Sequence, residues 1–194
     1  MSDAGPVELI RFAGEENSVV VRVLGRLEPG ILAYHDYLRA EIVVHSGFAR
    51  GQLAVPLSRR DLDDWERALG ALGAGQSVRW MNDGRNPEIQ LERTDDSEYV
   101  EVVVIDPVMS MTSVRVAVRL SDGRFTDQCD RLQLVRETWP SEVVETSYGA
   151  LTWRTWPIRR LRWEQLVGVT EATGAGRDRT DQVDRGSGYS KSAR

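Results

Sequence analysis

The chain has 194 residues, of which 41% are hydrophobic and 28% are charged, a composition typical of one soluble globular domain. No apolar run approaches the roughly 20 residues that a membrane-spanning helix needs, and the first residues lack the basic and then apolar pattern of a secretory signal. A single cysteine excludes an internal disulfide bond, so these features together predict a cytoplasmic protein.

The charge of the chain is unevenly distributed. Residues 154–194 carry 9 of the 25 basic and 5 of the 30 acidic side chains. Residues 1–153 therefore hold 16 basic and 25 acidic side chains, a net charge of −9. An acidic body repels nucleic acid phosphates and attracts basic proteins, so we expect a basic protein partner rather than nucleic acid or a membrane. The alternative is that the acidic surface only keeps the protein soluble.

Four strand-like segments come first, at 7–12, 18–24, 37–44 and 52–57. The second segment is apolar on nearly both sides, which predicts an interior strand. The third alternates, with Leu38 and Ile42 on one face and Arg39 and Glu41 on the other. Gly47 lies in the short connection between the third and fourth segments, which favours a hairpin there.

The hydrophobic period then changes to that of a helix over residues 58–73. Ser58 and Asp61 match the acidic variant of a capping box, in which each side chain accepts a hydrogen bond from the other residue's amide. An apolar stripe follows at helical spacing, and its members are Leu62, Trp65, Leu69 and Leu72. Gly73 and Gly75 then end the helix.

Strand-like segments resume at 78–81, 88–93, 99–105 and 114–120, and the third of these is again apolar enough to be an interior strand. A second amphipathic helix is predicted over residues 122–139, ending before Pro140. Its apolar stripe consists of Phe125, Cys129, Leu132, Val135 or Arg136, and Trp139. The order of these elements predicts an α+β fold, a mostly antiparallel sheet of about eight strands with two amphipathic helices.

Residues 1–153 are expected to form a single α+β domain, in which 143–144 and 151–156 add a peripheral strand. Residues 154–169 are interpreted as a weakly structured Arg- and Trp-rich extension, with a short helix at 158–167. Residues 170–194 are expected to be a disordered tail, because they have too few apolar side chains to offset the entropy of ordering. The aromatic residues Trp153, Trp156 and Trp163 favour docking of this extension on the sheet over a nucleic-acid platform, because aromatic side chains usually bury.

No motif for catalysis, for a metal or for a cofactor stands out. His35 and His45 are ten residues apart, about 33 Å along a regular strand, which is too far to ligate one ion. Cys129 could act as a nucleophile, but its place on the apolar stripe favours a packed side chain. No glycine-rich phosphate loop precedes a helix. We therefore expect no metal and no cofactor, and the sequence favours a binding protein over an enzyme.

One candidate binding face remains. The outward positions of the alternating strands carry a charged mosaic with one aromatic residue, and these residues are Tyr37, Arg39, Glu41, Glu88, Gln90, Glu92, Arg115 and Arg119. If their strands share one sheet, these side chains lie together on its outer face. The alternative is an outer face that is only solvated, as is common for antiparallel sheets.

Several of these residues carry a family resemblance that covers about residues 7–153. The resemblance depends on the series Tyr37-Leu38-Arg39-Ala40-Glu41, Leu57-Ser58, Leu62-Asp63-Asp64-Trp65-Glu66, Gly75, Trp80, Ile89, Val102 to Asp106 and Arg131-Leu132 to Trp139. The series resembles a family of uncharacterised actinobacterial proteins, a domain of unknown function. The strand–helix–strand plan with a tryptophan in the helix is also distantly similar to WapI-type immunity proteins, which bind and neutralise a toxin domain. The chain departs from the family at Arg124, where members tend to have tryptophan, and members end near Arg154.

Two functions from different classes follow. The first is a cytoplasmic binding module, immunity-like by resemblance, whose acidic body engages a basic partner protein. The second is an enzyme or a small-ligand-binding protein with a pocket between the sheet and the helices. The second function requires His35, Asp36 and His45 to converge in a cleft, and their dispersal would argue against it.

Overall fold

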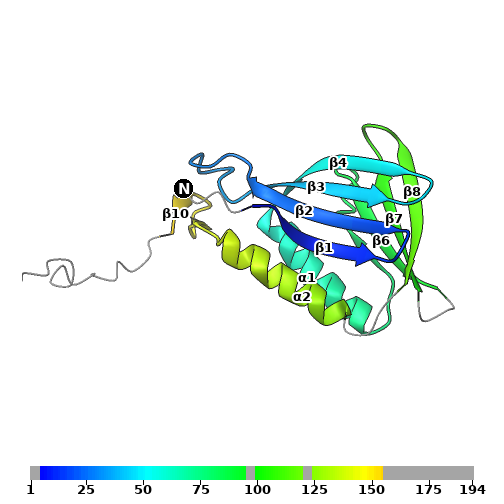
Figure 1. The fold of residues 1–194 in the computed structure, drawn as a ribbon. Coiled ribbons are helices and arrows are strands. Elements are labelled where there is room, and N and C mark those ends of the chain that lie inside the picture. Colours follow the sequence, from blue (N-terminus) through cyan, green and yellow to red (C-terminus); the bar gives the residue numbers. More distant parts are fainter. Residues whose placement is uncertain (1–4, 95–98, 120–123, 155–194) are drawn as a thin grey trace, which may run out of the picture. The chain divides into compact units, whose positions relative to one another are not determined.

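The computed structural model describes residues 5–94, 99–119 and 124–154. The first four strands form one antiparallel sheet in chain order, and they are β1 (Val7–Ala13), β2 (Ser18–Arg26), β3 (Leu38–His45) and β4 (Arg50–Leu57). The next four form a second antiparallel sheet, again in chain order, and they are β5 (Val78–Trp80), β6 (Glu88–Arg93), β7 (Tyr99–Asp106) and β8 (Thr112–Arg119). One helix follows each sheet, α1 (Arg59–Gly73) and α2 (Arg124–Thr138), and a hairpin of β9 (Val143–Glu145) and β10 (Leu151–Trp153) follows α2 (Figure 1).

This arrangement confirms the predicted α+β class, with antiparallel strands and two helices. The predicted interior strands are β2, between β1 and β3, and β7, between β6 and β8, and both positions are confirmed. The alternation of side chains does not show that the eight strands divide into two sheets of four. Helix α1 connects β4 to β5, and a helical connection does not continue a hairpin ladder, so the pairing is interrupted there.

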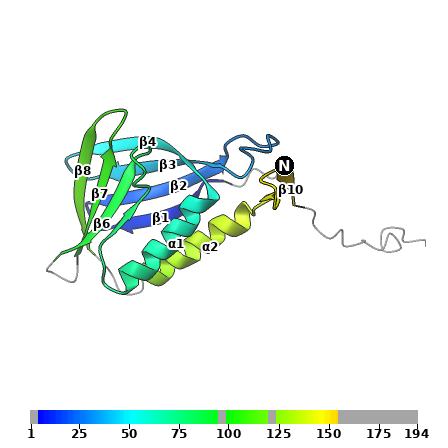
Figure 2. The same ribbon diagram turned by 180° about the vertical axis from the view of Figure 1, so that it is seen from behind.

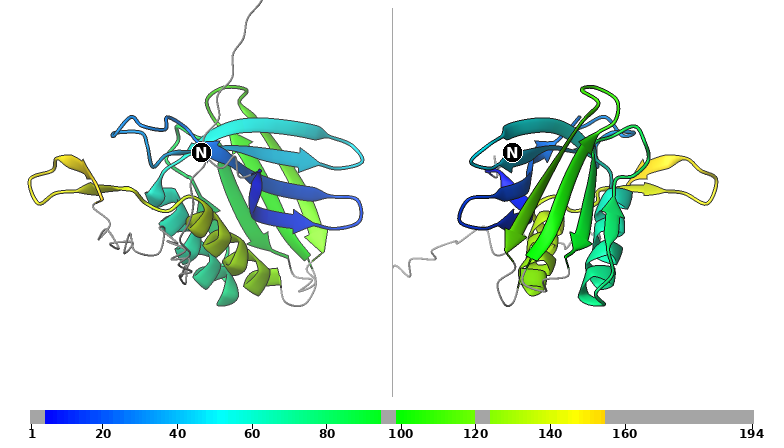
Figure 3. Two further views of the ribbon diagram at one scale, coloured as in Figure 1. Left: turned by 60° about the vertical axis from the view of Figure 1, so that its left-hand side comes forward. Right: turned by 90° about the vertical axis from the view of Figure 1, so that its right-hand side faces the viewer.

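The inner faces of both sheets and one side of each helix enclose a shared hydrophobic core. Strand β8 lies against β1 and β2, and Figure 3 shows the strands of the second sheet crossing those of the first. Figure 2 shows α1 and α2 side by side along the sheets. The burial of these faces supplies the main driving force for the fold.

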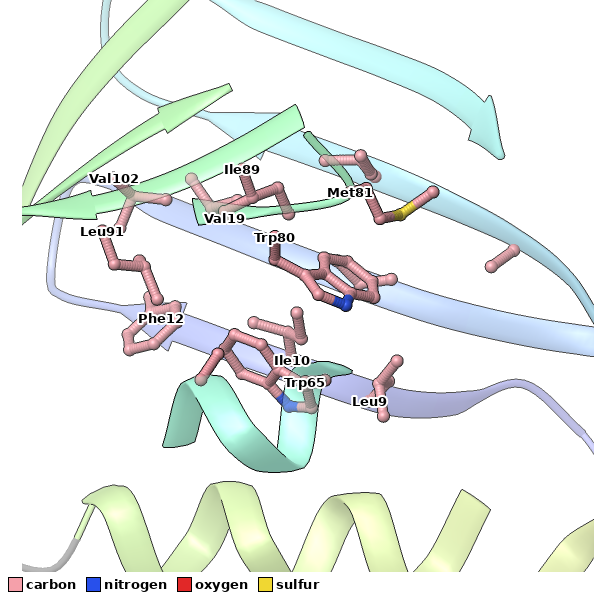
Figure 4. Packing of buried hydrophobic residues seen from close by; sticks show 14 of the residues in the cluster. Leu9, Ile10, Phe12, Val19, Trp65, Trp80, Met81, Ile89, Leu91 and Val102 are labelled. Carbon is pink, nitrogen blue, oxygen red and sulfur yellow. The ribbon is translucent and has the colours of Figure 1, made fainter. Parts of the chain in front are cut away.

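Two tryptophans lie at the centre of this core. Trp65 of α1 and Trp80 of β5 have ring centroids 5.6 Å apart, and Ile10 and Phe12 of β1 lie beside them (Figure 4). The indole Nε1 of Trp80 donates a hydrogen bond to the carbonyl oxygen of Asp61 at 2.7 Å. The buried Nε1 of Trp65 has no hydrogen-bond partner among the described residues. The two rings therefore differ in polar contacts although both are fully buried.

Helix α1 begins where the capping box predicts. The Ser58 hydroxyl accepts a hydrogen bond from the Asp61 amide at 3.3 Å, and the Asp61 carboxylate accepts one from the Ser58 amide at 2.7 Å. The predicted apolar stripe is buried, together with Ala68. Ala74 caps the carboxyl end, and Gly75 follows with a φ of 82°, a conformation that glycine adopts without steric cost.

Helix α2 corrects one prediction, because Cys129 is exposed and does not lie on the buried stripe. Gln128 is fully buried instead, in phase with the buried Leu132 and Val135. The Gln128 side chain donates to the Arg11 carbonyl oxygen at 2.7 Å and accepts from the Arg11 amide at 3.0 Å. Strand β1 is an edge strand, so the Gln128 amide occupies backbone groups that a further strand would otherwise pair with.

All described residues fall within the first of two units, Met1–Thr155, and the second unit, Trp156–Arg194, lies outside them. The predictions for residues 155–169, for the tail at 170–194, for the helix at 158–167 and for the side chains of Trp156 and Trp163 therefore lie outside the described residues, as does the predicted start of the second helix at 122. Among the residues that the structure describes, no helix is long and apolar enough to cross a membrane.

Candidate functional site

The eight residues of the predicted binding face lie on two sheets. Tyr37 precedes β3 and Arg39 and Glu41 lie on it, in the first sheet, whereas Glu88, Gln90 and Glu92 lie on β6 and Arg115 and Arg119 on β8, in the second. Gln90 is buried, and Arg115 and Arg119 are exposed. The premise of one shared sheet is wrong, because alternation along a strand does not reveal which strands pair. The binding role of these residues stays a prediction.

On the second sheet the charged side chains contact one another. Arg115 lies 3.5 Å from Glu92 and 2.5 Å from Glu101 of the neighbouring strand β7. Glu88 lies 3.8 Å from Arg79. Exposed pairs of this kind contribute little to stability, and they neutralise much of the charge that a partner would meet. This geometry favours the alternative of a solvated face.

On the first sheet each of the three predicted residues has different contacts. Glu41 lies 3.7 Å from Arg22, and its carboxylate accepts a hydrogen bond from the side-chain amide of Gln52. Arg39 is exposed on β3. Tyr37 lies before the strand, and its ring contacts the ring of Tyr34 with centroids 6.0 Å apart. No common pocket among those described contains all three predicted residues of this sheet.

A partly buried polar network joins the loop before β3 to the segment after α2. We call it the polar clamp, and its members are Arg26, His35, Asp36, Ser141 and Glu142. The Arg26 guanidinium donates to Asp36 Oδ1 at 2.9 Å and to Glu142 Oε1 at 2.8 Å. The side chains of Arg26 and Asp36 are only 11% and 13% exposed, so these bonds lie in a site where charged partners strengthen one another.

The imidazole of His35 bridges the two segments of the clamp. Its Nδ1 accepts a hydrogen bond from the Gly30 amide at 2.9 Å, which requires that the proton sits on Nε2. Nε2 then donates to Glu142 Oε2 at 3.0 Å. The ring of Trp153 on β10 contacts the imidazole edge-on, with centroids 4.6 Å apart. The hairpin of β9 and β10 is thereby attached to the loop before β3.

The carboxylate of Asp36 organises the other side of the clamp. Burial raises the pKa of Asp36, but hydrogen bonds from the Glu142 amide, the Ser141 hydroxyl and the Val143 amide, together with the charge of Arg59, outweigh burial and lower its pKa below the ordinary value. The Ser141 bond measures 2.7 Å and the Val143 bond 3.1 Å. Asp36 therefore stays ionised and holds the backbone that follows α2.

The convergence that the enzyme hypothesis requires does not occur. His35 and Asp36 lie in the clamp before the start of β3, and His45 lies at the opposite end of that strand. Within residues 5–94, 99–119 and 124–154, no group of three His, Cys, Asp or Glu side chains could hold a metal ion. The clamp is a structural tie, and sequence reasoning missed it because Arg26 and Glu142 are 116 residues apart.

A polar cleft of about 800 Å³ lies between α1, the end of β4 and the turn that follows β5. Its charged lining residues are three arginines and three aspartates, namely Arg60, Arg67, Arg79, Asp61, Asp64 and Asp83. Asp64 pairs with both Arg60 and Arg67, and Asp61 belongs to the capping box. The position matches the pocket predicted between sheet and helices, but His35, Asp36, His45 and Cys129 do not line it.

A second hollow lies where the two sheets open, and we call it the apolar mouth. Its volume is about 240 Å³, and its apolar lining residues come from both sheets: Ile42, Val44, Leu53, Val104 and Val114. Polar lining residues include Arg50 at the start of β4 and Asp106 and Thr112 at the hairpin of β7 and β8. An apolar hollow with few polar groups at its rim is typical of a binding site.

Large apolar side chains protrude from the two hairpins that border the apolar mouth. Phe48, in the turn between β3 and β4, is 100% exposed. Met109 and Met111, between β7 and β8, are 87% and 84% exposed, and Val108 is 54% exposed. Single exposed apolar residues are ordinary, whereas several beside an apolar hollow are typical of an interaction surface.

Both turns are held by local hydrogen bonds. The Ser46 hydroxyl accepts from the Phe48 amide at 3.2 Å. The Asp106 carboxylate accepts from the Met109 amide at 3.0 Å and from the Ser110 amide at 2.8 Å. The amide of Met109, and then the hydroxyl and amide of Ser110, lower the pKa of Asp106 below its ordinary value. The exposed side chains are therefore presented by ordered turns.

Sequence reasoning missed the apolar mouth because its walls come from strands of different sheets. A local signal was present in the turns, where polar residues are normally expected. Phe48 stands next to a glycine in a hairpin turn, and Val108, Met109 and Met111 stand in the connection between two strands. Apolar residues at turn positions have no inner face to occupy, so they indicate exposure.

Comparison with known proteins identifies the family. The chain belongs to the family of unknown function DUF5959, whose profile matches residues 7–140, more than half of the chain. This confirms the resemblance to a domain of unknown function, while the actinobacterial origin and the likeness to WapI-type immunity proteins stay predictions. No curated protein matches the chain. Among solved structures, the chain is similar to the plant transcriptional regulator PBF-2, with a TM-score of 0.46 and 10% identity over 70% of this chain and 83% of that chain.

Proposed function

We propose that this member of the DUF5959 family is a protein-binding module whose apolar mouth and bordering hairpin turns contact a basic partner protein. The observation that carries the proposal is the exposure of Phe48, Met109 and Met111 beside an apolar hollow. Monomeric soluble proteins rarely leave apolar side chains of this size together in water unless the surface binds another molecule.

The energetics of this surface suit protein binding. Burying a large apolar side chain completely contributes about 1.5–3 kcal/mol, so Phe48 and the two methionines could supply most of the affinity. Methionine adapts its shape to a partner surface. The hydrogen bonds of Ser46 and Asp106 hold the turns in place before binding, which reduces the entropy lost on association.

The net charge of residues 1–153 favours association with basic proteins. The net charge of −9 in residues 1–153 attracts basic proteins over long range. Such attraction mainly raises the association rate, and salt weakens it. We therefore expect the apolar mouth to determine affinity and the acidic body to favour basic partners.

Capture of a partner tests the proposal. The full-length protein on beads is incubated with extract of its source cells at low and high salt, the captured protein is identified, and binding is repeated with that protein purified. Phe48→Ser, and Met109→Ser combined with Met111→Ser, are each expected to weaken binding at least about tenfold. Tyr148→Ser is the matched control, because it removes another aromatic ring that is 96% exposed but lies in the turn between β9 and β10.

Two outcomes would contradict the proposal. Absence of any basic partner at both salt concentrations would argue against a protein-binding role. A partner that binds the mouth variants as tightly as it binds the wild type and the Tyr148→Ser control would exclude the apolar mouth as the binding surface.

A more specific version of the proposal is a cytoplasmic, immunity-like protein that neutralises a toxin domain. Its support is the sequence resemblance to WapI-type immunity proteins and the acidic charge of the body. It predicts that co-expression of the wild-type protein restores growth to cells that produce the captured partner, whereas the Phe48→Ser variant does not restore it. Growth inhibition that the wild-type protein leaves unchanged would remove this version.

The polar cleft supports a second candidate function, the binding of a small polar ligand. Its volume of about 800 Å³ lies within the range of known ligand pockets. Ligand screening by amide chemical shifts would test this function, since a true ligand should shift the amides of Arg67, Arg79 and Asn82 together. Shifts spread evenly over the surface would contradict it.

A further inference from the structure

We infer that the partner contributes an extended segment that pairs with the free edge of β4, places an apolar side chain in the apolar mouth and directs a carboxylate toward Arg50. This inference rests on the proposed function, because the surface is the same. It specifies the form and the chemistry of the segment that the partner presents.

Strand β4 is an edge of the first sheet, and no side chain of the described residues bonds to its backbone at Gln52 or Ala54. At the edge of β1, the Gln128 side chain occupies the amide and carbonyl of Arg11. At the edge of β8, the Asn17 side chain donates to the Ala117 carbonyl oxygen at 3.0 Å. Helix α1 lies against β5. Unprotected edges invite pairing with another chain, and natural proteins normally cover or interrupt them.

The pairing of β3 and β4 shows which backbone groups of β4 point outward. The Ser46 amide donates to the Ala49 carbonyl oxygen at 2.8 Å across the turn, and hydrogen-bonded pairs then alternate along an antiparallel ladder. The register places Gln52 and Ala54 in the other pairs, whose amides and carbonyls face away from β3. Pro56 has the same parity, and its lack of an amide proton fits an outward position.

These outward groups are available for pairing. No hydrogen bond from the described part of the chain reaches the outward amides of Gln52 and Ala54. Both residues are exposed. An extended segment laid along this edge would satisfy their backbone groups and continue the first sheet, the mode of recognition known as strand addition.

Gly51 creates the hollow that would receive the segment's side chain. The inward positions of β4 are Gly51, Leu53, Val55 and Leu57, and the last three progressively close the core. A Cβ atom added at Gly51 would meet nothing within 4 Å. The resulting mouth of about 240 Å³ exceeds the apolar cavity of about 150 Å³ that is known to hold benzene. One apolar side chain therefore fits.

Arg50 supplies the charge at the rim of the mouth. Its side chain lines the hollow and is exposed, and it forms no ion pair or side-chain hydrogen bond with any residue in the described ranges. Asp106 also lines the mouth, but its two oxygens accept hydrogen bonds from the turn that follows it. A carboxylate on the bound segment would thus find an unpaired guanidinium.

Peptide binding tests the inference on the full-length protein. The probe is an acetylated, amidated hexapeptide of alternating threonine and valine with a glutamate after its last valine, and the matched probe carries glutamine instead. We expect the glutamate peptide to shift the amides of Gly51, Gln52 and Thr112, and to bind about five- to tenfold more tightly than the glutamine peptide.

Three variants separate the parts of the inference. Gly51→Val fills the mouth from within and should abolish binding of both peptides. Gln52→Pro removes an outward donor, as Pro56 already does further along, and should weaken both peptides at least about fivefold. Arg50→Gln should reduce the glutamate peptide to the affinity of the glutamine peptide. Gly70→Ala is the control, since it also meets nothing within 4 Å but lies on α1.

The outcomes decide between this inference and the proposed function. Unchanged peptide binding by folded Gly51→Val and Gln52→Pro would overturn the inference, as would binding of 3-methylbutanoate alone as tightly as the peptide, which would assign the mouth to a small free acid. A partner that is lost by Phe48→Ser but retained by all three β4 variants would sustain the proposed function and overturn only the inference.

Discussion

The most informative test of the fold is the substitution Gln128→Leu on α2. Gln128 is fully buried, and its side-chain amide forms two hydrogen bonds with the backbone of Arg11, at 2.7 and 3.0 Å. Leucine has a similar size but cannot form either bond. The substitution therefore leaves an amide and a carbonyl of β1 without partners, while the helix and its apolar stripe stay intact.

The expected loss can be worked from these two contacts. Each net hydrogen bond is worth about 1 kcal/mol, and stranding its partner in a buried place adds a desolvation cost. The added apolar surface of leucine offsets part of that cost. We expect the free energy of unfolding to fall by about 2 kcal/mol, a large fraction of the stability of a domain this size.

Urea denaturation followed by tryptophan fluorescence measures this loss as a lower midpoint at unchanged slope. Gln133→Leu on the same helix is the matched control, because Gln133 is exposed and bonds only to Glu137, and it should change stability by less than about 0.5 kcal/mol. If Gln128→Leu unfolds at the same urea concentration as Gln133→Leu, the reasoning that a buried glutamine protects the edge of β1 is refuted.

The remaining predictions concern the core, the clamp and the exposed thiol. Trp80→Phe should cost about 1 kcal/mol more than Trp65→Phe in urea denaturation, because only Trp80 loses a hydrogen bond, to the Asp61 carbonyl; equal losses would contradict this. The pKa of Asp36 is lowered in the folded protein from its ordinary value of 3.8. The ionised carboxylate therefore contributes fully to the free energy of unfolding above that pH, and this contribution is lost as the pH falls through the folded pKa. Below about pH 4, the free energy of unfolding should therefore fall less steeply with decreasing pH in Asp36→Asn than in the wild type. Identical pH profiles of the two proteins would contradict this prediction. Cys129 is exposed, so a thiol reagent should modify one cysteine per native chain without denaturant, whereas protection until unfolding would place the thiol inside.

The features predicted correctly from the sequence are those that depend on local contacts. The capping box of Ser58 and Asp61 and the stripe through Trp65 lie within one helix, so spacing alone determines them. The interior position of β2 follows from apolar residues on both of its faces. Neither inference required knowledge of a partner distant in the chain.

The wrong predictions concern residues whose burial or pairing depends on a contact distant in the sequence. A glutamine on a helix normally faces water, so the sequence pattern shifts the stripe by one residue to Cys129. The structure buries Gln128 because Arg11, 117 residues away, satisfies its amide. The premise that the predicted binding face lies on one sheet was wrong for a similar reason. Arg39 and Arg115 lie on different sheets, and no local sequence pattern shows which strands pair. The hollow at Gly51 could likewise not be predicted, because it forms only where β4 lies beside the second sheet.

The two ends of β3 differ in which side chains are buried: charged side chains at its start are largely buried, and an apolar side chain at its far end is exposed. At its start, the clamp buries charged groups such as Arg26 and Asp36 and satisfies them, which closes the structure around the segment after α2. At its far end, the turn exposes Phe48, and the neighbouring strand leaves a hollow at Gly51. The exposed apolar side chains at the far end of β3 are not needed for folding. Replacing them with polar residues would stabilise the isolated protein. Their presence is accounted for if the far end of β3 is completed by a second molecule.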